Sequence, residues 1–143
     1  MAYSTQTDLL RVVSEIELSQ LTSEIDGEIA TDVVDGAIAD ADADIDGYVA
    51  VRYEVPLSPV PKMVQRISTT IALYHLYSRR QNRIGGMSEV VQKNYDNAIK
   101  TLKDVSKGSV SLGVDPPPGN TSTSVDDFEA DERDYTKDSM KGF

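Results

Sequence analysis

The chain has 143 residues, of which 39% are hydrophobic and nine are aromatic, and it carries a formal net charge of −10 without a single cysteine. This length and composition predict one domain with a modest core, and the lack of cysteine excludes disulfides, thiolate metal sites and cysteine nucleophiles. No apolar run is long enough to span a bilayer, and the N-terminus lacks the pattern of a signal peptide, so we expect no membrane insertion.

The charges are segregated along the chain. Residues 1–61 carry 13 acids and 2 bases (net −11), residues 62–114 carry 3 acids and 9 bases (net +6), and residues 115–143 carry 8 acids and 3 bases (net −5). This segregation suits contacts in which the acidic part of one copy faces the basic part of another. The alternative is that both parts are solvated faces without a partner.

Two capping patterns predict two short helices at the start of the chain. Thr5 and Asp8 form the first pattern and open a helix over residues 5–13, and Ser14 and Glu17 form the second. We expect these two helices to pack as a lid or arm on the longer helices that follow.

Three longer helices are predicted over residues 31–53, 61–80 and 88–106. In the first, apolar residues recur with a period near 3.6 while six aspartates fill most other positions, which indicates an amphipathic helix with an acidic outer face. The fold class is therefore mostly α: a small bundle of two short N-terminal helices and three longer helices, with an extended C-terminal arm.

A proline-rich corner joins the acidic helix to the next one. Three prolines fix φ and remove backbone donors, so the chain must leave the helix, run extended and enter another helix. The predicted hinge consists of Tyr53, Pro56, Pro59 and Pro61.

The chain divides into a helical body over residues 1–107, an extended segment and Pro-rich spacer over 108–119, and an acidic arm over 120–143. Residues 110–114 alternate apolar and small side chains, which is typical of an edge strand or an extended segment. The arm has the composition of a disordered tail but ends with possible anchors at Tyr135, Met140 and Phe143. We expect it to lie on another chain.

One motif resembles part of a calcium-binding loop. Asp42, Asp44, Asp46 and Gly47 match positions 1, 3, 5 and 6 of an EF-hand loop. Tyr53 stands where a bidentate glutamate is needed, and the helical pattern continues through the motif, so an acidic helix face is the competing interpretation.

No pattern of residues predicts an enzyme. The single histidine, His75, cannot form a metal site alone and is expected to be packed or to face a pore. The chain has no nucleophile elbow, and the Gly85-Gly86 pair follows no predicted strand, so it indicates a turn between helices. We expect no cofactor.

The basic residues gather in the second half of the body. A role in DNA contact is possible for this surface, but aromatic residues are not interleaved with the bases and the whole chain is acidic, which favours pairing with protein. The predicted intersubunit or partner surface consists of Arg79, Arg80, Arg83, Lys93, Lys100 and Lys103.

Several segments in order resemble the Mu-type phage family of small head-completion or head-tail connector (adaptor) proteins. The resemblance covers most of the chain and is carried by residues 3–9, 45–57, 59–61, 67–77, 95–102 and 135–143.

The resemblance implies a virion protein of the head-tail neck, made in the host cytoplasm. Such an adaptor forms a homo-oligomeric ring, usually a dodecamer, beneath the portal protein, extends the DNA channel, and offers a docking surface to the tail or the next neck protein. DNA would be present only as channel contents. We hypothesise that the acidic helix lines the channel, where like charge keeps DNA from adhering, through Asp35, Asp40, Asp42, Asp44 and Asp46.

Two other functions remain open. A tail-terminator or tail-completion protein would share the virion role, but it would be richer in strands and form a ring of lower symmetry. A calcium-binding interaction module would use the motif at residues 42–53.

Overall fold

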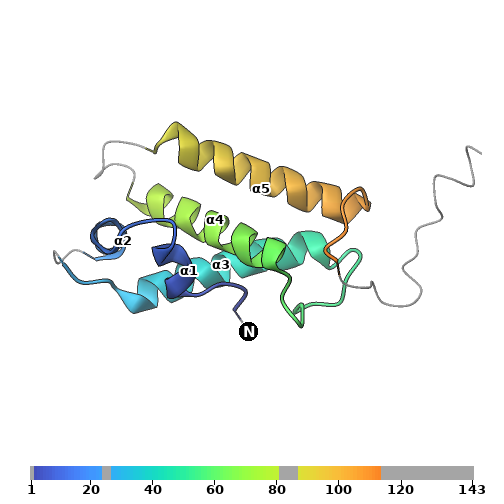
Figure 1. Ribbon diagram of the computed structural model, residues 1–143, viewed down its shortest axis with the longest axis horizontal. Coiled ribbons are helices and arrows are strands. Elements are labelled where there is room, and N and C mark those ends of the chain that lie inside the picture. Colours follow the sequence, from blue (N-terminus) through green and yellow to red (C-terminus); the bar gives the residue numbers. More distant parts are fainter. Residues whose placement is uncertain (1, 24–26, 81–86, 114–143) are drawn as a thin grey trace, which may run out of the picture.

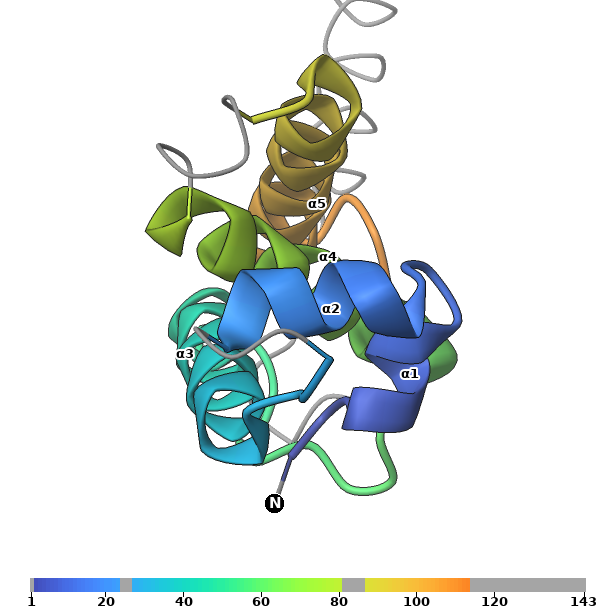
Figure 2. The same ribbon diagram turned by 90° about the vertical axis from the view of Figure 1, so that its left-hand side faces the viewer.

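The computed structural model describes residues 2–23, 27–80 and 87–113, which fold into helices joined by turns and extended segments (Figures 1 and 2). The prediction of two short helices followed by three long ones is confirmed, and no strand occurs in these ranges. The helices are α1 (Gln6–Leu10), α2 (Glu15–Thr22), α3 (Thr31–Val49), α4 (Lys62–Arg79) and α5 (Glu89–Lys107).

The bundle is organised around α4. In Figure 1, α4 lies between α5 above and α3 below, and Figure 2 shows α2 crossing in front of α3 and α4. The four other helices all contact α4. Its buried apolar side chains form much of the core, namely Val64, Ile67, Ile71, Ala72, Leu73, Leu76 and Tyr77.

The predicted capping box at the start of α1 is present. The hydroxyl oxygen of Thr5 accepts from the backbone N–H of Asp8, while Oδ2 of Asp8 accepts from the backbone N–H of Thr5 at 2.9 Å. The second box is one-sided, because Ser14 accepts from the N–H of Glu17 but the Glu17 carboxylate accepts from the hydroxyl of Tyr77 on α4. This second bond ties α2 to the central helix, as expected of a packing arm.

The acidic helix ends four residues earlier than its sequence pattern suggests. The backbone N–H groups of Arg52 and Tyr53 both donate to the carbonyl of Val49, so the chain turns after that residue. Val51 is consequently 63% exposed and does not belong to the buried stripe, whereas Tyr53 reaches the core.

The chain after α5 forms no strand over 110–113, the described part of the segment that was predicted as strand or extended. Instead, Leu112 is buried, and its N–H donates to the hydroxyl of Tyr53 at 3.3 Å. Within the ranges that the structure describes, the helices are too short or too polar to cross a membrane.

Gly108 ends α5 in a left-handed conformation with φ of 88°. A Cβ atom at this position would lie 1.7 Å from Nη1 of Arg52, whose guanidinium covers the end of the helix. Gly47 is different, because a Cβ atom there would meet no atom within 4 Å.

We expect opposite effects from alanine at these two glycines. Gly108→Ala should lower the free energy of unfolding by about 1–2 kcal/mol, since alanine is strained at this φ and displaces Arg52. Gly47→Ala should raise it by about 1 kcal/mol, because alanine favours a helix interior. Urea denaturation of the two variants measures both changes, and equal effects would contradict the assigned backbone conformations.

Candidate functional site

The five aspartates predicted to line one face of the acidic helix lie in two rows on α3. An α-helix turns by about 100° per residue, so residues two apart point in nearly opposite directions. Asp35, Asp42 and Asp46 therefore lie on one side, and Asp40 and Asp44 lie on another. Asp35 and Asp40 are exposed, whereas the other three are half-buried. The prediction of a single acidic face is wrong because alternate residues cannot share a helix face.

The first row holds the N-terminal segment against the bundle. The backbone N–H of Tyr3 donates to Oδ2 of Asp42 at 3.0 Å, and its hydroxyl donates to Asp46. The same hydroxyl accepts from the N–H of Leu57 at 2.9 Å, and Ser68 donates to Oδ1 of Asp42 at 2.8 Å. These two carboxylates thus join the N-terminus, α3, α4 and the proline-rich corner.

Burial changes the acidity of this network. Burial and the nearby charge of Asp46 raise the pKa of Asp42, although the bonds from Tyr3 and Ser68 act in the opposite direction. Burial, followed by the hydrogen bond to Asp46, raises the pKa of Tyr3 to about 12. The Tyr3 hydroxyl therefore stays protonated at neutral pH and donates its hydrogen bond to Asp46.

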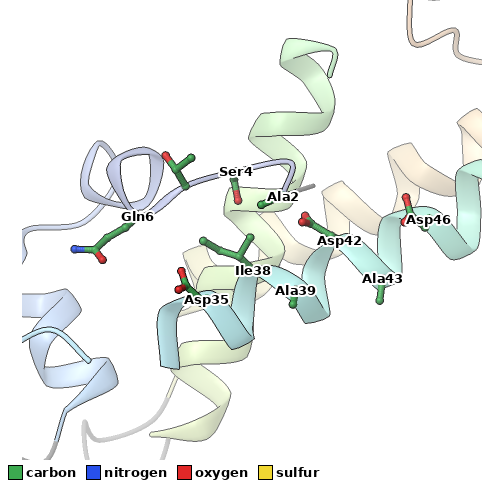
Figure 3. Close-up of a pocket in the computed structure, with 10 residues that line it drawn as sticks. Ala2, Ser4, Gln6, Asp35, Ile38, Ala39, Asp42, Ala43 and Asp46 are labelled. Atoms are coloured by element: carbon green, nitrogen blue, oxygen red, sulfur yellow. The ribbon is translucent and has the colours of Figure 1, made fainter. Parts of the chain in front are cut away.

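A hollow of about 510 Å³ lies between the N-terminal segment and α3 (Figure 3). Two of its carboxylates, Asp42 and Asp46, are already hydrogen-bonded to Tyr3, and its remaining walls are largely small side chains. Its lining consists of Ala2, Ser4, Thr5, Gln6, Asp35, Ile38, Ala39, Asp42, Ala43 and Asp46.

The calcium-loop interpretation of residues 42–53 is wrong. An EF-hand loop needs a sharp turn at its glycine, but Gly47 lies inside α3. The aspartates of the motif consequently point to different sides of the helix. In the part of the chain that the structure describes, no group of three His, Asp or Glu side chains is placed to hold a metal ion.

In the second row, Asp44 contacts an aromatic cluster between α3, α4 and α5, while Asp40 is exposed. Oδ2 of Asp44 lies 3.0 Å from Nε2 of His75, which is partly exposed, so the histidine is paired across two helices. Tyr74 stacks on Tyr95 of α5 with a centroid distance of 3.7 Å. Burial, and then the charge of Asp44, raise the pKa of Tyr95. This arrangement explains the lone histidine by packing and hydrogen bonding.

The predicted hinge is the proline-rich corner between α3 and α4. It contacts the N-terminal segment and the segment after α5. Tyr53 is 5% exposed and binds the segment after α5, while Leu57 binds Tyr3. Pro56 and Pro59 are exposed and follow cis peptide bonds. Pro61 stands at the N-cap of α4, one position before the first helical residue.

The residues of the predicted basic surface differ in their exposure, and their role at an interface stays a prediction. Arg80 does not belong to it, since this residue is 6% exposed and lies one helical turn after the buried Tyr77. Arg83 lies outside the described residues, as do the arm anchors at 135, 140 and 143. The exposed members are Arg79, Lys93, Lys100 and Lys103.

Sequence reasoning missed the roles of Tyr3 and Ser68. Both residues meet the acidic helix only through contacts between segments far apart in the chain. The one available signal was the presence of an aromatic residue in the N-terminal segment that carried the family resemblance.

Comparison with known proteins relates nearly the whole chain to one family. The family model described as "Bacteriophage Mu, Gp36" matches residues 3–129. The "Mu-like prophage FluMu protein gp36" of Haemophilus influenzae is 33% identical over 77 residues, which are 54% of this chain and 50% of that protein. "Gene product J" of Escherichia phage Mu is 31% identical over 78 residues, which are 54% of this chain and 51% of that protein. These matches thus span about half the length of each curated relative.

Proposed function

Because the chain belongs to the bacteriophage Mu Gp36 family, we propose that it is a subunit of the phage neck that forms a ring beneath the portal. Membership of the family indicates a phage structural or morphogenesis protein. The finer role is that of a head-tail connector, which extends the DNA channel and offers the tail or the next neck protein a docking surface. The observation that carries this proposal is the family match, which includes all five helices.

The architecture supports a connector over a tail terminator. The described ranges contain helices and no strand, while a terminator of the tail is expected to be richer in strands. The side chains that could have indicated catalysis are bonded within the bundle: Asp44 pairs with His75, and Asp42 and Asp46 hold Tyr3. These three aspartates are therefore no longer part of the proposed channel surface.

A phage that lacks this chain should make filled heads and complete tails that do not join. Electron microscopy of lysates measures this outcome, and the wild-type chain supplied in trans should restore joined particles. Tails of abnormal length would instead favour the tail terminator, and normal particles would contradict both roles.

The acidic arm suggests a second variant for the same assay. A chain ending at residue 119 keeps the helical body but lacks the arm anchors, so it should fold and fail to restore joined particles. Circular dichroism of the purified variant provides the control for folding. Full restoration by this variant would show that the arm is not needed for docking.

A further inference from the structure

The outer face of α3 consists of the exposed residues Gly36, Ala43, Gly47 and Ala50, and along one edge it borders the hollow beside the N-terminal segment. Small exposed residues run along it, and a Cβ atom at Gly36 or Gly47 would meet nothing within 4 Å. These glycines weaken a helix interior, and packing within the chain does not require them. Of the exposed carboxylates, Asp32 lies on this face, while Asp35 and Asp40 flank it on opposite sides.

The outer face of α5 carries the opposite charge. Lys100, Lys103 and Lys107 are exposed, and their spacing of three and four residues places them on one face. The two ion pairs within the described ranges are Arg11 with Asp8 and His75 with Asp44, so neither these lysines nor the exposed aspartates are paired there.

We propose that the outer face of α3 in one copy packs antiparallel against the outer face of α5 in a second copy. This contact rests on the proposed ring and identifies the surfaces that join its subunits. Both helices have 19 residues, about 28 Å, so they can pack along their full length.

In the antiparallel register, aspartates of α3 face lysines of α5, and an exposed valine near one end of each helix lies close to the other. Each step towards the C-terminus of α3 corresponds to an equal step towards the N-terminus of α5, within one or two residues. The facing pairs are Asp32 with Lys107, Asp35 with Lys103, and Asp40 with Lys100. Val51, in the turn just after α3, comes near Val90 in the first turn of α5, and the two valines are 63% and 65% exposed.

A parallel arrangement fits the charges less well. It would place Asp32 beside Glu89, Asp40 opposite the uncharged Asn97, and Lys107 opposite the uncharged Ala50. In the antiparallel arrangement, Asp96 of α5 lies opposite the small Ala43, and its carboxylate accepts from Gln92 on its own helix. The small residues of α3 leave room for the facing lysine side chains.

The positions of the two helices explain how such a contact builds a ring. α3 and α5 lie on either side of α4 (Figure 1), so each copy offers one face to each of two neighbours. A contact between different surfaces generates a closed ring when the rotation between copies closes.

Cross-linking in the cysteine-free chain tests the contact. Ala43→Cys and Asn97→Cys, combined in one chain, are predicted to face each other between copies. Mild oxidation of the purified protein should then produce a ladder of dimers, trimers and larger species on non-reducing gels. Ala43→Cys alone should give no species beyond a dimer.

A matched pair tests the register. Ala50→Cys lies on the same face of α3, two turns and about 10 Å further along. Combined with Asn97→Cys, it exceeds the Cα separation of about 7 Å that a disulfide tolerates, so the ladder should be lost. Equal ladders from both pairs, or none from the first, would overturn the proposed contact.

Charge reversal separates this contact from a face that lines the DNA channel. In the Ala43→Cys and Asn97→Cys background, Asp32→Lys with Asp40→Lys should abolish the ladder, as should Lys100→Glu with Lys107→Glu. All four changes together should restore it. Lys62→Glu with Arg66→Glu, two exposed positions on α4, is the control and should preserve it. Ladders that persist after either reversal would contradict the charge pairing.

The same cross-linking in assembled particles distinguishes this inference from the proposed function. Double-cysteine protein that enters joined particles without forming the ladder would overturn the contact and leave the neck role intact. Wild-type protein that is absent from particles would count against the neck role itself, whatever the purified protein shows.

Discussion

Replacing Ile71 by alanine is expected to remove roughly 2–5 kcal/mol from the free energy of unfolding. This side chain is completely buried in α4, the helix that contacts all the others. Its truncation loses apolar burial and leaves a cavity between helices that cannot collapse independently. Such a loss is a large fraction of the roughly 5–15 kcal/mol that stabilises a typical domain.

The same change at an exposed isoleucine is the control. Ile16 is 71% exposed on α2, so Ile16→Ala should alter the free energy of unfolding by less than about 0.5 kcal/mol. Urea denaturation of both variants measures the difference. Similar losses at the two positions would mean that the burial assigned to α4 is incorrect.

Removing the hydroxyl group of Tyr3 is expected to lower the free energy of unfolding by about 1–3 kcal/mol. In the Tyr3→Phe variant, the buried N–H of Leu57 loses its acceptor and Asp46 loses its donor. The ring still fills its place in the core, so the effect reports on the hydrogen bonds. Tyr74→Phe is the control, because the Tyr74 ring stacks on Tyr95 and its hydroxyl makes no hydrogen bond in the described structure.

The pH dependence of stability gives a second measure of Tyr3. Burial and the bond to Asp46 raise its pKa from 10.0 to about 12, so the unfolded chain loses this proton first. The stabilisation is complete below pH 10 and is lost as the pH rises towards 12. Tyr77, whose pKa is also raised by burial and by Glu17, contributes to the same decline.

Between pH 10 and 12, the free energy of unfolding should therefore fall less steeply with pH in Tyr3→Phe than in the wild type. Some decline should remain, because Tyr77 still contributes to it. Tyrosinate absorbance and denaturant unfolding, measured over this range, check the result. A slope unchanged by the substitution would show that Tyr3 titrates normally in the folded protein.

The long helices were predictable because the spacing of their apolar residues agreed with the residues that commonly begin and end helices. Ser88 and Gly108 bound α5, and Pro61 immediately precedes α4. The end of α3 was harder, because Val51 continues the apolar pattern although the chain has already turned at Val49.

The candidate surfaces were less predictable than the helices. Counting aspartates indicated an acidic helix correctly, but their division into two rows follows from helical geometry and not from composition. The bonds from Tyr3 to Asp42 and Asp46 depend on how distant segments pack, which local patterns do not encode. The same reason applies to Arg80, whose charge predicted a surface position although the end of α4 buries it.

The central position of α4 also determines how the folded chain can open. Amide protons in α1 can exchange with solvent when that five-residue helix detaches, since the three long helices remain packed together. The amides in the middle of α4 have no such local route, because exposing them requires separation from both α3 and α5. Their exchange should therefore follow global unfolding, so that the slowest-exchanging amides of the bundle mark this helix.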